Sequence, residues 1–137
     1  MKKLLLLAAL SIAVFKSAWA DIVVIVNSSN DVVMAKSDVR RIYMGKSGQF
    51  PNGKPTKAMN YESNNALRHQ FDKGLLNRDP AQIQALWAKL VFTGQGIPPT
   101  IAANPQDMIN FVKSEPNAIG YINESDVSPE VRVVIKF

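Results

Sequence analysis

Residues 22–26 (Ile-Val-Val-Ile-Val) are five consecutive β-branched residues, and they constrain the fold of this chain more than any other feature. Branching at Cβ disfavours helix and favours strand. A strand with no polar alternation has both faces buried, as in a sheet covered by helices on both sides. The run therefore predicts an interior strand of an α/β domain.

Short strands and helical patterns alternate along the rest of the chain. The other predicted strands are 56–60, 118–122 and 131–135. The predicted helices begin at Ser37, at Ser63 or Asn64, at Asp79 and at Asn104. The third has the strongest amphipathic pattern, with apolar residues from Ile83 to Val91. Residues 45–55 and 93–100 are rich in Gly and Pro and are expected to form loops. We expect a mixed sheet flanked by about four helices.

The first twenty residues have the pattern of a secretory signal peptide. Two lysines precede an apolar run over residues 4–15, and Ala18 and Ala20 form an A-x-A cleavage pattern before Asp21. The run is shorter than the ~20 residues needed to span a bilayer. We expect cleavage after Ala20 and a single periplasmic domain, residues 21–137, with no membrane anchor.

Charge and residue types exclude several functions. Three lysines lie in the first twenty residues, so the formal charge falls from +5 to +2 on their removal, and nucleic acid is not an expected partner. The chain has no cysteine and one histidine, His69. No cluster has the spacing of metal ligands, and no serine lies in a nucleophile motif. We expect neither an enzyme nor a cofactor.

Polar residues fill the connection at positions 60–65, just before the second predicted helix. A helix N-terminus has unpaired N–H groups and a positive dipole end, so it can hold an oxyanion. The candidate ligands are Tyr61, Ser63, Asn64, Asn65 and Arg68. The alternative is ordinary capping, in which Ser63 or Asn64 binds the backbone of its own helix.

Three segments resemble the phosphate-type periplasmic solute-binding proteins, which are the binding components of ABC importers. Residues 37–47 are similar to the family's I-F-x-G-K segment. Trp87 with residues 92–98 is similar to its W…F-x-G-x-G segment and the following proline. Residues 118–122 resemble its A-I-G-Y-V strand. The resemblance implies one lobe of a type II periplasmic-binding-protein-like fold.

The same resemblance implies a function and also shows departures. Family members close two lobes on the ligand, whereas this chain matches the second lobe only. Tyr61 occupies the position of the family's ligand-binding arginine, and Asn65 begins the stretch that replaces its Ser-Gly-Thr motif. The resemblance implies an oxyanion ligand such as phosphate and an ABC permease or another envelope protein as partner. The alternative function is a cell-envelope interaction module that keeps the fold without a ligand.

Overall fold

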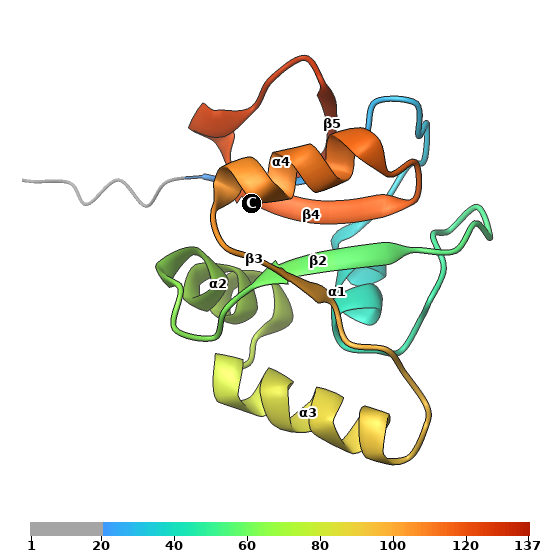
Figure 1. Ribbon diagram of the computed structural model, residues 1–137, viewed down its shortest axis with the longest axis vertical. Coiled ribbons are helices and arrows are strands. Elements are labelled where there is room, and N and C mark those ends of the chain that lie inside the picture. The colour runs from blue at the N-terminus through green and yellow to red at the C-terminus, as the bar shows by residue number, and fades with distance from the viewer. Residues whose placement is uncertain (1–20) are drawn as a thin grey trace, which may run out of the picture.

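A five-stranded mixed sheet organises residues 21–137, the part of the chain that the computed structural model describes (Figure 1). The strands are β1 (Ile22–Asn27), β2 (Lys57–Tyr61), β3 (Thr100–Ala102), β4 (Ala118–Asn123) and β5 (Val131–Lys136). Their order is β3-β2-β4-β1-β5. β1 pairs antiparallel with β4 and β5, whereas β2 is parallel to β3 and β4. All six residues of β1 are buried, which confirms the predicted interior strand.

Four α-helices flank this sheet, as expected for an α/β domain. They are α1 (Lys36–Tyr43), α2 (Ala66–Phe71), α3 (Pro80–Phe92) and α4 (Pro105–Ser114). A π-helical turn, η1 (Asp72–Leu76), continues α2, and a short 3₁₀ turn, η2 (Glu124–Asp126), follows β4. In Figure 1, α4 covers one face of the sheet, α1 and α2 lie on the other side, and α3 is furthest from β4.

Aromatic side chains of the core pack β4 against α2 and α1, next to the β2–α2 connection. Tyr121 of β4 stacks on Phe71 of α2, with ring centroids 3.7 Å apart and the planes within 5°. Tyr43 of α1 meets both rings edge-on. On the opposite face of β4, Gly120 leaves room for Met108 of α4. Close packing on both faces of β4 therefore fixes where β2 ends and α2 begins.

Two helix starts differ from the predicted positions. Ala35, not Ser37, is the N-cap residue of α1, and the Asp38 carboxylate accepts the Ala35 N–H at 2.8 Å. A carboxylate three residues into the helix can satisfy a terminal donor without a hydroxyl at the cap. α2 begins at Ala66, and its N-cap is Asn65 rather than Ser63 or Asn64.

The loop predicted at 93–100 and the third helix also need correction. The loop ends in β3, a strand of three residues that was not predicted. α3 begins at Asp79–Pro80 as predicted, but only Pro80 and Ile83 of its residues are buried. Val91 is half-exposed and Phe92 is fully on the surface. The amphipathic pattern of α3 therefore overstates how much of this helix the domain itself buries.

The signal-peptide prediction lies outside the described residues. Within residues 21–137, no helix has the length and apolar character needed to cross a bilayer. The same residues contain no group of three His, Cys, Asp or Glu placed to hold a metal ion.

Candidate functional site

A concavity of about 210 Å³ lies between the end of β2, the N-terminal half of α2, and α3. Its lining comprises Asn60, Glu62, Ser63, Arg68, Gln84, Trp87, Pro98, Pro99 and Ile101. The β2–α2 connection supplies the polar groups, while α3 and the segment leading into β3 supply mostly apolar surface. A few polar groups converging on an apolar wall are typical of small-ligand sites.

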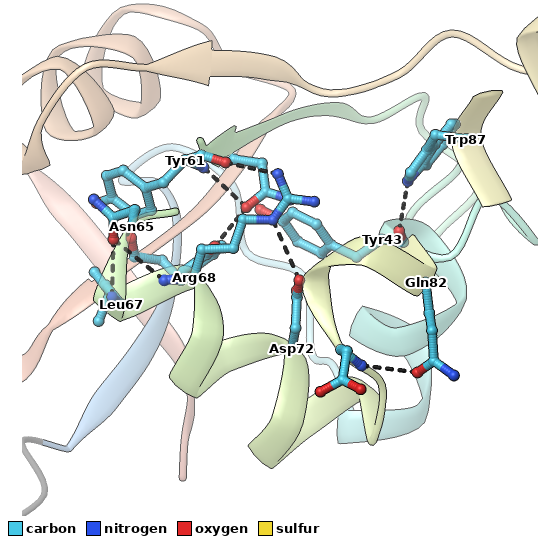
Figure 2. Close-up of polar contacts among 11 residues, drawn as sticks. Tyr43, Tyr61, Asn65, Leu67, Arg68, Asp72, Gln82 and Trp87 are labelled. Atoms are coloured by element: carbon cyan, nitrogen blue, oxygen red, sulfur yellow. Dashed lines mark hydrogen bonds and ion pairs between the residues drawn. The ribbon is translucent and has the colours of Figure 1, made fainter. Parts of the chain in front are cut away.

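Arg68 is the charged centre of this concavity, although only 7% of the residue is exposed. Its Nε donates to Asp72 Oδ2 at 3.2 Å, and its Nη1 donates to the Tyr61 carbonyl at 2.9 Å. Figure 2 shows both contacts, which hold the guanidinium at the end of β2. The remaining nitrogen, Nη2, has no acceptor among the described residues and is not enclosed. It is therefore free to donate into the concavity.

Asn60 presents a second donor, and the core fixes its orientation. The residue is 2% exposed, and its Oδ1 accepts from the Tyr121 hydroxyl and from the Tyr61 N–H. These donors assign the oxygen of the amide, so the nitrogen must face the other way. Asn60 Nδ2 has no acceptor among residues 21–137, yet it is not sealed in the core. Asn60 lines the same concavity as Arg68.

Two of the five predicted ligands, Ser63 and Arg68, lie together in this concavity. Asn64 lines a neighbouring hollow with His69, Lys73 and Asp79. The Asn65 Oδ1 accepts from the N–H groups of Leu67 and Arg68, at 2.8 and 3.3 Å (Figure 2). These donors at the start of α2 are therefore satisfied by capping, and Asn65 is the capping residue.

Tyr61 points in the opposite direction from the concavity. It is fully buried, and its hydroxyl donates to the Tyr121 carbonyl at 3.0 Å. Burial raises the pKa of Tyr61 well above its ordinary value, with a smaller contribution from Asp126, so the hydroxyl stays protonated. The contribution of Tyr61 to the concavity is its backbone carbonyl, which positions Arg68.

Asp72 is the ion-pair partner of Arg68, and its negative charge offsets the positive charge of the guanidinium. Its carboxylate is completely buried, and Oδ1 has no hydrogen-bond partner among the described residues. Desolvation raises the pKa of Asp72, although the Arg68 charge and hydrogen bond act in the opposite direction. Glu62 is exposed at the rim of the concavity and opposes anion binding there.

Asn60, Gln84 and Trp87 were not predicted as site residues. Trp87 is held by its indole N–H, which donates to the Tyr43 carbonyl at 2.9 Å (Figure 2). Asn60 ends the apolar part of a predicted strand, where polar residues often point to a functional edge. The position of Asn60 at the end of a strand could have predicted it as a site residue. Gln84 and Trp87 could not be predicted in this way, because no local sequence pattern indicates that α3 lies next to this edge of the sheet.

Solved structures of phosphate-binding proteins share this fold. One is a protein of Clostridium perfringens, described as a phosphate ABC transporter substrate-binding protein and solved with bound phosphate; its TM-score is 0.67 at 21% identity. An ABC-type phosphate transport receptor of Vibrio cholerae matches with a TM-score of 0.64 at 15% identity. A protein of Planctomyces limnophilus, described as a possible phosphate binding protein, matches with a TM-score of 0.59 at 12% identity.

Each match covers 84% of this chain but only 45%, 46% and 41% of those three chains, respectively. The chain thus spans less than half the length of the structures that it matches. No protein-family model matches the chain, and no curated protein matches it. At these identities the likeness establishes the fold, and it confirms the α/β class and the resemblance to one lobe of a binding protein.

Proposed function

We propose that this chain is a periplasmic solute-binding domain that holds a phosphate-like oxyanion and serves an ABC-type importer. The proposal rests on two residues that line one concavity and that each keep a free donor, Arg68 with Nη2 and Asn60 with Nδ2. An oxyanion offers several acceptor oxygens, and charge-assisted donors from arginine suit it well. Ser63 adds a hydroxyl to the same lining.

The site is open on one side, and this limits its affinity. Solvent-exposed ionic contacts contribute only ~0–1 kcal/mol each. A site of this kind is expected to bind with Kd ~1 mM, which corresponds to about −4 kcal/mol. One of the solved structures, of which the match covers 45%, was determined with bound phosphate, which supports the ligand class for the proposal.

Isothermal titration with phosphate and with sulfate tests the proposal. We expect saturable binding to the purified protein and its loss in Asn60→Asp. This change keeps an acceptor oxygen in place of Asn60 Oδ1 but replaces the amide donor by a second, negatively charged oxygen. Asn110→Asp, the same change at an exposed position of α4, is the matched control and should bind as the parent does. Absence of saturable heat at ~10 mM ligand, about ten times the expected Kd, would refute it.

A ligand-free interaction module is the second candidate function. Phe92 and Ile97 are 91% and 90% exposed. Large apolar side chains that are exposed close together are typical of surfaces that bind another protein. The titration distinguishes the two candidate functions, because a ligand-free interaction module predicts no binding heat with either phosphate or sulfate.

A further inference from the structure

α3 is unusually apolar for a helix on the outside of a small domain. Lys89 is the only charged residue among its thirteen. Helices that are apolar all round are normally buried on all sides. The domain covers only one side of α3, where Ile83 is buried and Trp87 and Leu90 pack near Gly45 and Gly96.

The side of α3 that faces away from the domain is apolar as well. It consists of Ala81, Ala85, Ala88 and Phe92, all of them exposed. Their spacing of four, three and four residues places them in one straight stripe, as in the seam of a helix pair. We call this stripe, together with its neighbours Val91 and Ile97, the α3 outer face.

We propose that the α3 outer face is the interface of a homodimer, in which two copies of α3 pack antiparallel about a two-fold axis. Antiparallel pairing centred between Ala85 and Ala88 places each Phe92 opposite the partner's Ala81. A bulky side chain then meets a small one at both ends of the pair, and small residues in the middle let the helices approach closely. The face is therefore complementary to itself, as a two-fold interface requires.

Charge does not oppose this arrangement. In the antiparallel register Lys89 lies opposite the partner's Gln84, so the only charged side chain of α3 does not face its own copy. Asp79, the N-cap residue, lies near the C-terminal end of the partner's helix, where the helix dipole disfavours a carboxylate, but its charge is offset by the ion pair with Lys73 of its own chain. Antiparallel helices also place opposite dipole ends side by side.

The exposed area is of the size that a stable dimer needs. A standard interface buries roughly 800 Å² on each partner. Phe92 alone offers roughly 150–250 Å², and Ile97, Val91 and the alanines bring the α3 outer face to the same order of area. This interface is independent of anion binding: it uses Ala81, Ala85, Ala88 and Phe92, none of which lines the concavity of Asn60 and Arg68.

Sedimentation of the purified protein over ~1–100 µM tests the dimer. We expect a monomer–dimer equilibrium in the parent, and an increase of about 100-fold in the dissociation constant for Phe92→Asp and for Ala85→Glu, because each buries an unpaired charge. Both residues are exposed, so the fold of the subunit should survive, as circular dichroism will verify. Gln106→Glu on α4 is the control and should dimerise as the parent does.

Cross-linking tests the register, because the chain contains no cysteine. Mixing Ala85→Cys with Ala88→Cys should give a disulfide-linked dimer on oxidation, whereas Gln106→Cys should not. A protein that stays monomeric throughout this range would overturn the proposal. A dimer that is insensitive to Phe92→Asp and Ala85→Glu would also overturn it, because the interface would then lie elsewhere.

Discussion

Single residues at the concavity combine contacts that hold the fold with polar groups that remain free. Arg68 ties α2 to the end of β2 through Nη1, pairs with Asp72 through Nε, and leaves Nη2 free. Asn60 uses its oxygen in the core and leaves its nitrogen free. A donor held this way needs no reordering when a ligand arrives, which lowers the entropic cost of binding. The geometry of this site is therefore set by the core rather than by the loop.

Asp72 gives a testable pH dependence at the residue scale. Because burial raises the pKa of Asp72 in the folded state, the folded chain keeps this proton at pH values where the unfolded chain, with a pKa of about 3.9, has lost it. Between those two pKa values stability must fall as pH rises. We expect Asp72→Asn to remove this part of the slope.

Urea unfolding of both proteins between pH 3 and pH 8 measures the effect. Asp31→Asn, at an exposed position, is the matched control and should keep the parent's slope. If the parent instead gained stability relative to Asp72→Asn as pH rose, the Arg68 ion pair would dominate over desolvation, and this account of Asp72 would be wrong.

At the scale of elements, local sequence specified most strands and helices. The β-branched run predicted β1 correctly because the strand preference of these residues is local. Asp79 and Pro80 predicted the start of α3 because a capping residue followed by proline favours the first turn of a helix. β3 escaped detection because three residues after a Pro-rich loop form a strand only by pairing with distant β2. The orientation of Asn60 was equally out of reach, since it depends on Tyr121, 61 residues away.

The N-cap of α2 is a prediction at this scale. Asn65→Ala removes the acceptor of two N–H groups at the helix start and should lower the free energy of unfolding by ~1 kcal/mol. Its exposed neighbour gives the control, because Asn64→Ala should change stability by less than ~0.5 kcal/mol. Chemical denaturation of the two variants compares them directly. An equal loss in both would restore Asn64 as a capping residue.

At the scale of the whole molecule, an open concavity and an exposed α3 accompany a match to less than half of each solved structure. In two-lobed binding proteins closure excludes water and buries most of a small ligand. This chain matches less than half of each of the three solved structures, and its concavity is open to solvent. The sequence resemblance anticipated this single lobe and its fold. Arg68 was a predicted ligand, but the free donor of Asn60 and the capping of the N–H groups of Leu67 and Arg68 by Asn65 were not predicted.

Nuclear magnetic resonance can test atom by atom the proposed binding of an oxyanion between Asn60 and Arg68. In a titration of the ¹⁵N-labelled protein with phosphate to ~10 mM, we expect saturable shifts of the Asn60 side-chain amide, the Arg68 side-chain N–H and the Trp87 indole N–H, with one common Kd of ~1 mM. Unsaturated shifts scattered over exposed lysines and absent from these three groups would contradict the account.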